Sequence, residues 1–194
     1  MSDWRYHISH NLGTLTAVGL FVLMFVVYIS NHEAGLTPAV ATTAANKAVL
    51  LALVAMAQTL PVLTRGLDLS VGMIFVMANC LASAIVVGSL GEGFIGCVGV
   101  LAMGVAAGFV NGAIVVWGRL QPIITTLATG AVYYGIALWI RPTPGGDVQY
   151  DIADFVTGQL FETIPTSLVV LLVVVLVVWI PYRKTVLGRG ADAV

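Results

Sequence analysis

The stretch TRGLDLSVGM at residues 64–73 places charged and hydroxyl side chains between two apolar runs. Asp68 stands where the N-cap of the following helix belongs and could accept hydrogen bonds from its free N–H groups, with Ser70 in the first turn. Gly66 and Gly72 would allow a tight turn and close packing beside them. Capping explains Asp68 but does not require the whole string, so a solvated turn and a functional motif at a membrane surface both stay open.

Further polar side chains lie inside the long apolar runs, where contact with lipid would be costly. Each should therefore face protein or a water-filled path. Hydrogen bonding between helices explains most of them without any substrate, and the lining of a solute pathway is the alternative. The candidates for a pathway are Asn79, Asn111, Tyr133 and Tyr134.

Glycines recur every four residues in GVAAGFVNG, at Gly104, Gly108 and Gly112. This spacing puts all three on one face of a helix, where the missing side chains let a neighbouring backbone approach closely. The pattern predicts helix packing at this face. A contact between two copies of the chain is the alternative.

The sequence carries no signature of an enzyme or a metal site. The three histidines, His7, His10 and His32, lie outside the apolar runs and lack ligand partners at helical spacing. The patterns G-x-S-x-G, H-E-x-x-H and G-x-x-x-x-G-K-[ST] do not occur. We therefore expect no catalytic residue, no metal and no cofactor, and any ATP that drives the protein must bind another chain.

The elements that position these residues must be membrane helices. The chain has 194 residues, of which 59% are hydrophobic and 9% charged, whereas soluble domains carry about 25% charged residues. The mean hydropathy is +1.02. A polytopic membrane protein with a single membrane domain over residues 1–194 is the predicted class, and the net charge of −1 gives no reason to expect nucleic acid as a partner.

Six stretches approach the roughly 20 apolar residues that a helix needs to cross a bilayer. They predict an all-α fold with spans at roughly 12–29, 45–64, 69–89, 93–117, 121–140 and 164–181. With a cytoplasmic N-terminus, most of the basic residues fall inside, and only Lys47 and Arg141 fall outside. Because cytoplasmic loops are enriched in Lys and Arg, this bias predicts the N-in orientation.

Three stretches resemble one protein family. RGLDLSVG at 65–72 resembles the G-[IL]-D-L-S-V-G signature of ribose-type ABC sugar permeases, the membrane subunits of bacterial binding-protein-dependent importers. The stretch 108–130 is similar to the family's G-x-x-N-G…P-x-[IV]-x-T-L segment, and YRKTVLGRG at 182–190 to its basic stretch after a long apolar span. Arg65 stands where the family commonly has glycine.

The resemblance implies the pore-forming subunit of an importer for a monosaccharide or related small polar solute, in the bacterial inner membrane. It implies an ABC ATPase subunit, a periplasmic sugar-binding protein, a second permease copy and membrane lipid as partners. It covers only roughly the N-terminal three-fifths of a typical member, so we expect a C-terminally truncated permease bundle. The rival expectation is a transport-incompetent membrane fragment, which inserts but drives no uptake. The sequence names neither the sugar nor the oligomeric state.

Overall fold

The computed structural model describes residues 11–33, 35–161, 164–185 and 188. The chain forms two compact units, Met1–Ala44 and Ala45–Val194, and the boundary between them falls inside helix α3 (Pro38–Leu63). The prediction of one membrane domain over the whole chain stays a prediction.

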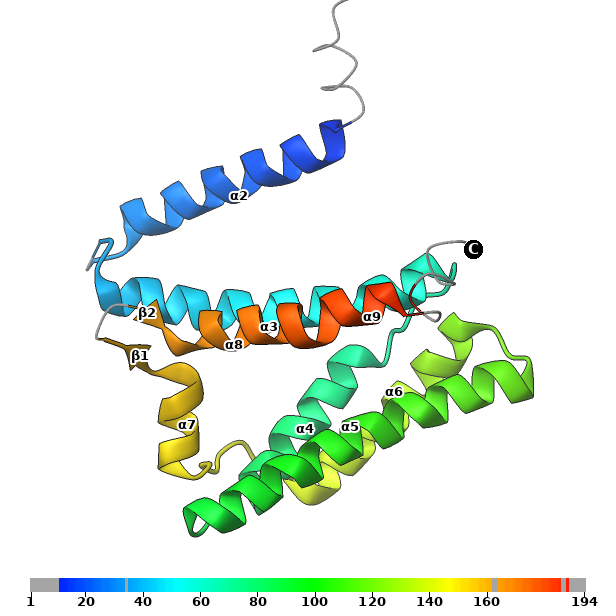
Figure 1. Ribbon diagram of the computed structural model, residues 1–194. Coiled ribbons are helices and arrows are strands. Elements are labelled where there is room, and N and C mark those ends of the chain that lie inside the picture. Colours follow the sequence, from blue (N-terminus) through cyan, green and yellow to red (C-terminus); the bar gives the residue numbers. More distant parts are fainter. Residues whose placement is uncertain (1–10, 34, 162–163, 186–187, 189–194) are drawn as a thin grey trace, which may run out of the picture. The chain divides into compact units, whose positions relative to one another are not determined.

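The first unit contains helix α2, Leu12–Asn31 (Figure 1), whose sequence is mainly apolar. None of its residues is buried. Its 20 residues rise about 30 Å, which matches the hydrocarbon thickness of a bilayer. The helix coincides with the first predicted span, and its mainly apolar surface is one that lipid would cover.

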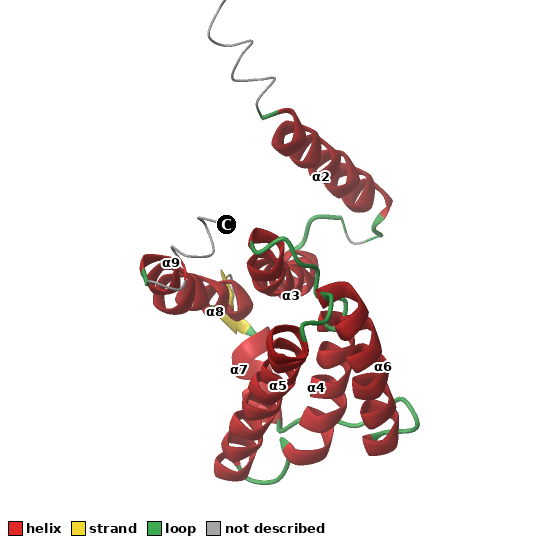
Figure 2. Cartoon of the chain, turned by 90° about the vertical axis from the view of Figure 1, so that its right-hand side faces the viewer, coloured by secondary structure: helices red, strands yellow, loops and turns green. Residues whose placement is uncertain are grey.

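The second unit is built almost entirely of helices (Figures 1 and 2). After α3 follow α4 (Val71–Ile85), α5 (Leu90–Gly118), α6 (Pro122–Ile140), α7 (Tyr150–Thr157), α8 (Thr166–Val174), the π-helical η1 (Val175–Trp179) and α9 (Ile180–Lys184). Two-residue strands, β1 (Gln159–Leu160) and β2 (Ile164–Pro165), pair antiparallel between α7 and α8. The predicted all-α membrane class is confirmed.

The π-helical turn joins α8 and α9 into one continuous helix. The N–H of Ile180 donates to the carbonyl of Val175, five residues earlier. Pro181 follows directly and has no N–H to donate, and its ring would crowd the carbonyl four residues before it. A wider turn relieves that crowding, so the last apolar run stays helical from Thr166 to Lys184.

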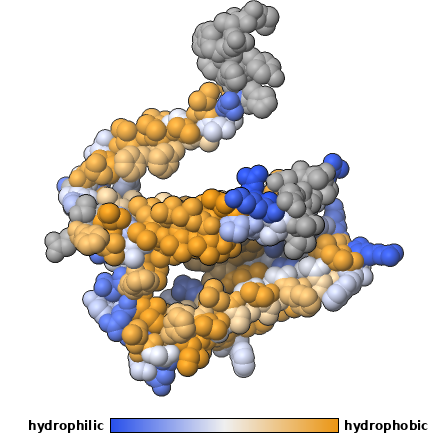
Figure 3. All heavy atoms as spheres, viewed as in Figure 1, coloured by the Kyte–Doolittle hydropathy of each residue, from blue (hydrophilic) through white to orange (hydrophobic). Residues whose placement is uncertain are grey.

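Among the described residues, five helical segments are long and apolar enough to cross a membrane. They are Leu12–Asn31, Pro38–Leu63, Leu90–Gly118, Pro122–Ile140 and Thr166–Lys184. Figure 3 shows apolar residues in orange over most of the visible helix surfaces. The predicted span 69–89 is the exception, because α4 has only 15 residues and rises about 22 Å. About six membrane helices were predicted, and the described chain has five of membrane length and one shorter apolar helix, α4, which is bounded on each side by non-helical segments.

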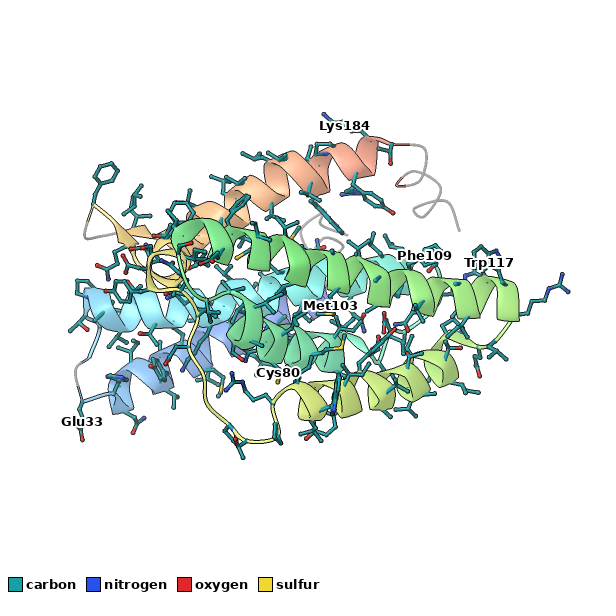
Figure 4. The ribbon with its side chains drawn as sticks, turned by 90° about the horizontal axis from the view of Figure 1, so that it is seen from below. Glu33, Cys80, Met103, Phe109, Trp117 and Lys184 are labelled. Atoms are coloured by element: carbon teal, nitrogen blue, oxygen red, sulfur yellow. The ribbon has the colours of Figure 1, made fainter. Side chains whose placement is uncertain are left out.

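The core of the second unit lies where α4, α5 and α6 meet. Its buried residues are Met77 on α4, Ala107 on α5, and Tyr133 and Ala137 on α6. Cys80 and Met103, labelled in Figure 4, pack against this cluster from α4 and α5. The short helix α4 is thus held by two longer neighbours.

The connection between α4 and α5 turns within four residues. Gly88 adopts φ +83°, and Ser89 begins α5 with a capping box to Glu92, in which each side chain bonds the other residue's backbone N–H. One turn later Gly96 meets the end of α4: a Cβ there would overlap the Ile85 carbonyl and lie 2.9 Å from the Val86 Cα. The two helices can approach this closely only because residue 96 is glycine.

Helix α7 is tied to the same end of the second unit. The Gln149 N–H donates to the Val86 carbonyl over 2.7 Å, and the Asn46 amide donates to the Thr157 carbonyl over 2.7 Å. Ile152 covers Gly93 in the first turn of α5. The start of α5, the region of α3 around Asn46 and both ends of α7 therefore lie together.

The glycines of α5 yield a matched pair of tests. We expect Gly96→Ala to lower the midpoint of thermal unfolding, because the new Cβ has no room and overpacking costs about 1–3 kcal/mol. Gly104→Ala meets nothing within 4 Å, so it should leave stability unchanged or raise it by up to about 1 kcal/mol through helix propensity. Heating detergent-solubilised protein and measuring the monodisperse fraction by size exclusion checks both. Equal effects of the two changes would contradict the close α4–α5 packing.

Candidate functional site

The segment Leu67–Ser70, between α3 and α4, is non-helical although it packs among helices. It follows a turn in which Arg65 adopts φ +57° and the Gly66 N–H donates to the Pro61 carbonyl over 2.8 Å. A Cβ on Gly66 would contact Pro122, the first residue of α6, at 3.4 Å. The end of α3 and the start of α6 are therefore neighbours.

Side chains from other helices bond the backbone of this segment. The Leu69 N–H donates to the Thr126 hydroxyl of α6 over 2.9 Å. The Gln58 amide of α3 donates to the Asp68 carbonyl over 2.8 Å. These bonds replace the ones that a continuous helix would have supplied, which lets a non-helical backbone sit in an apolar surrounding.

A chain of buried side-chain hydrogen bonds continues from Asp68 into the α4–α5–α6 core. The Ser70 N–H and hydroxyl both donate to the Asp68 carboxylate, over 2.8 and 2.6 Å. The Asn111 amide of α5 donates to the Ser70 hydroxyl over 2.7 Å. The Tyr133 hydroxyl of α6 lies 2.9 Å from the Ala107 carbonyl and 3.2 Å from the Asn111 side-chain oxygen. Ser70 is 0% exposed and Asn111 4%, so we call Asp68, Ser70, Asn111 and Tyr133 the buried network.

The expectation that Asp68 caps the third span is wrong. Helix α4 begins at Val71 with Ser70 as its N-cap residue, so Asp68 stands two positions before the cap. Its carboxylate bonds Ser70 instead of the free N–H groups of the first helical turn, because Leu67–Ser70 precedes the helix as a non-helical segment. Of the two motif glycines, Gly66 contacts Pro122, whereas a Cβ on Gly72 would meet nothing within 4 Å.

An open cavity of about 420 Å³, lined by both polar and apolar side chains, lies between the C-terminal halves of α4 and α6. One face of α4 lines it with Val76, Asn79, Cys80 and Ser83, at helical spacings of three and four. One face of α6 lines it with Tyr134, Leu138 and Arg141, and the loop Pro142–Gly146 closes the end. We call this space the α4–α6 cavity.

Arg141 is the one charged residue among the residues that line the α4–α6 cavity. Its guanidinium donates from Nη2 to the Ser83 carbonyl in the last turn of α4, over 3.2 Å, and its buried Nε–H has no partner. A Cβ on Gly146 would lie 2.5 Å from the guanidinium, and Gly146 adopts φ +92°. Glycine therefore lets the loop backbone lie directly on the arginine side chain and fix its position.

The four residues predicted to line a pathway are divided between the α4–α6 cavity and the buried network. Asn79 and Tyr134 line the α4–α6 cavity, whereas Asn111 and Tyr133 belong to the buried network. Their role in a pathway stays a prediction. From the sequence alone, Arg141 and Ser83 were not grouped with Asn79 in one site. The spacing was visible, because Asn79 and Ser83 share one helix face, as do Tyr134, Leu138 and Arg141.

The helix-packing expectation for Gly104, Gly108 and Gly112 stays a prediction. A Cβ at any of the three would meet nothing within 4 Å. Close approach to α5 occurs instead at Gly93 and Gly96, one to two turns from its start. The α5 side chains that meet α4 and α6 are those of Ala107 and Asn111, so the three glycines point to another face. A contact there with a second copy of the chain stays a proposal.

Metal ligation finds no support in the part of the chain that the structure describes, where no three His, Cys, Asp or Glu side chains gather closely enough. The α4–α6 cavity is lined by neutral polar groups, apolar side chains and one guanidinium. Such groups can bind and orient a polar solute, and they contain no activated nucleophile.

A helical chain with five helices of membrane length is a multi-pass membrane protein. Residues 40–194 match the model of the family described as "Branched-chain amino acid transport system / permease component", and the chain belongs to that family. The family is one of transport components.

The chain is similar to the autoinducer 2 import system permease protein LsrC from several bacteria. It is 31% identical to that of Escherichia coli (strain SMS-3-5 / SECEC) over 185 residues, which are 91% of this chain and 51% of the relative. It is 30% identical to that of Photorhabdus luminescens over 194 residues, 94% of this chain and 55% of the relative. The chain thus spans about half the length of these relatives. No solved structure matches it significantly.

The buried network predicts an asymmetry between Ser70, the N-cap residue of α4, and Ser83 in its last turn. Ser70→Ala should lower stability by about 1–3 kcal/mol, because it leaves the buried Asn111 amide without its acceptor and removes one of the two bonds to the Asp68 carboxylate. Ser83→Ala should cost less than about 0.5 kcal/mol, since its hydroxyl donates only to the nearby Cys80 carbonyl. Thermal unfolding of the two variants in the same detergent measures the difference. Ser70→Ala as stable as Ser83→Ala would show that the network does not hold the segment.

Proposed function

We propose that the chain is a membrane-spanning permease part of an ABC importer that carries a small polar solute across the bacterial inner membrane. The observation that carries this proposal is the bonded, non-helical segment Leu67–Ser70 among membrane helices. Non-helical backbone at membrane depth is tolerated only where protein buries it or a cavity borders it, and transporters use such breaks beside their solute paths.

The solute in this proposal is a monosaccharide or a molecule of similar size and polarity. The names of the relatives, permeases of autoinducer 2 import systems, support a small polar cargo. The family description names branched-chain amino acids, which makes an amino acid the competing substrate class. Ribose itself is not singled out by either name.

The partners follow from the importer class. ATP hydrolysis would occur in a separate ABC ATPase subunit, and a periplasmic binding protein would deliver the solute. A second permease copy and surrounding lipid would complete the assembly. A membrane fragment without transport activity is the alternative function for this chain.

The N-terminus would be cytoplasmic in this proposal. Arg65 and Arg119 lie at one end of the second unit, where Gly66 contacts Pro122. Asp147, Asp151 and Asp154 lie at the opposite end, in the connection between α6 and α7 and in α7 itself. Basic residues mark the cytoplasmic side of membrane proteins. The exposed Trp117 and Trp139, near the ends of α5 and α6, suit the two headgroup layers.

Uptake by a chimeric permease tests the function. Residues 40–194 of this chain replace the aligned part of an autoinducer 2 permease, which is expressed with its own ATPase and binding protein in cells that lack other permeases for that solute. We expect the chimera to restore uptake of labelled autoinducer 2 or of labelled ribose. The unaltered relative is the positive control, and cells without a permease are the negative control.

A chimera that inserts and co-purifies with the ATPase but accumulates neither solute would contradict the proposal. That result would favour the fragment without transport activity. Uptake of leucine in place of both solutes would keep the importer class and change its substrate.

Labelling of engineered cysteines tests the orientation. In the 194-residue chain with Cys80 and Cys97 changed to Ala, Asp151→Cys should react with a membrane-impermeant maleimide added to spheroplasts. Arg119→Cys should react only after the membrane is permeabilised, because the basic end is retained in the cytoplasm. The inverse pattern at both positions would overturn the N-in orientation.

A further inference from the structure

The α4–α6 cavity combines hydrogen-bonding groups with apolar surface. Asn79 and Tyr134 provide an amide and a phenol, and Arg141 provides a guanidinium. Val76 and Leu138 provide aliphatic surface between these groups. The volume of about 420 Å³ lies within the range of about 300–1,000 Å³ that small-molecule sites occupy.

The guanidinium of Arg141 has more donors than the protein uses. Arginine carries five N–H donors, and the structure gives one bond, from Nη2 to the Ser83 carbonyl. Among the described residues Arg141 forms no ion pair, and the residues that line the cavity include no carboxylate. A positive charge held in place without a counter-ion favours a ligand that offers oxygen lone pairs.

We propose that the α4–α6 cavity is a binding site for a small polyhydroxylated, sugar-like solute, held through Arg141, Asn79 and Tyr134. The proposal rests on the proposed importer function, because it places the solute of that function in the membrane protein itself. Paired hydroxyl oxygens of the solute would accept from the guanidinium and the Asn79 amide. The C–H face of the ring would pack on Val76 and Leu138.

The same lining disfavours a free amino acid. An α-carboxylate could bind Arg141, but the α-ammonium group would lie in a space where the fixed charge is also positive. Asp147 follows Gly146 in the sequence and does not line the cavity. The positive charge in the cavity therefore favours binding of neutral or anionic solutes with hydroxyl groups over binding of zwitterionic solutes.

The cavity contains its own chemical reporter. Cys80 lines it with a free thiol, whereas Cys97, the other free thiol, lies on α5 outside the lining. A solute in the cavity would shield Cys80 and leave Cys97 unaffected. The native chain therefore carries both a probe and an internal reference.

The experiment measures alkylation by N-ethylmaleimide of the full 194-residue chain in lipid nanodiscs, with mass spectrometry to separate the two cysteines. We expect D-ribose, at rising concentration, to slow modification of Cys80 and not of Cys97. L-leucine at the same concentrations should protect neither. Arg141→Gln and Asn79→Ala should each raise the ribose concentration for half-protection about tenfold, the loss expected for one strong hydrogen bond.

Two further variants separate ligand binding from a structural role of Arg141, which also joins the ends of α4 and α6. Arg141→Lys keeps a positive charge where the ends of α4 and α6 meet but lacks the forked donors of the guanidinium. It should therefore retain the midpoint of thermal unfolding and lose most of the ribose protection of Cys80. Thr59→Ala removes a hydroxyl that bonds only the Ala55 carbonyl of its own helix, and it should be protected like the native chain.

Protection that survives unchanged in Arg141→Lys and Asn79→Ala would overturn the site, and so would equal protection of Cys97. Protection by leucine as strong as by ribose would overturn the solute class. If the chimeric permease imports solute and ribose leaves Cys80 fully reactive, the site is wrong and the importer function stands. If ribose protects Cys80 and the chimera imports nothing, the importer function is wrong and the sugar-binding cavity stands.

Discussion

A backbone that leaves the helical form inside an apolar surrounding loses the hydrogen bonds that a helix supplies to itself, and lipid offers none in return. The segment Leu67–Ser70 meets this constraint with side chains from two other helices. Thr126 accepts from the Leu69 N–H, and Gln58 donates to the Asp68 carbonyl. The hydrogen bonds that these four residues need therefore fix the positions of α3, α4 and α6. Packing of apolar surfaces alone is non-directional and would fix them less firmly.

That placement determines which faces of α4 and α6 look at each other along their length. Ser70 lies beside Gly130, where a Cβ would be 3.4 Å from the Ser70 Cα, so α4 begins in close contact with the middle of α6. Within the next two turns the core residues Met77, Tyr133 and Ala137 lie on the shared face. The adjacent face then brings Asn79 and Ser83 opposite Tyr134 and Arg141. The cavity is a geometric consequence of the register that the buried network sets.

The sequence predicted the helices that depend on hydrophobicity alone and failed where specific bonds decide. The long apolar runs around α2 and α5 could be recognised from composition. The start of α4 could not be placed within the run 69–89, because Leu69 is as apolar as the helix residues and the bonds to Thr126 and Gln58 that hold the non-helical segment come from distant parts of the chain. Spacing also did not reveal the close approach of α4 to Gly96, which lies outside the regular pattern of Gly104, Gly108 and Gly112. Arg141 looked like a loop charge because its partner, the Ser83 carbonyl, is distant in sequence.

The family match and the names of the relatives leave two substrate classes, and the fold cannot choose between them, since one architecture serves many solutes. In our proposal, the electrostatics of the α4–α6 cavity distinguishes the two substrate classes. A guanidinium without a neighbouring carboxylate raises the cost of any cationic group in the same cavity, and the cost is larger beside apolar walls than in water. Hydroxyl groups carry no such penalty, and they can accept from the forked donors and donate to the Asn79 side-chain oxygen in one orientation. The unpaired charge of Arg141 is thus the feature of this chain that bears most directly on what it would carry.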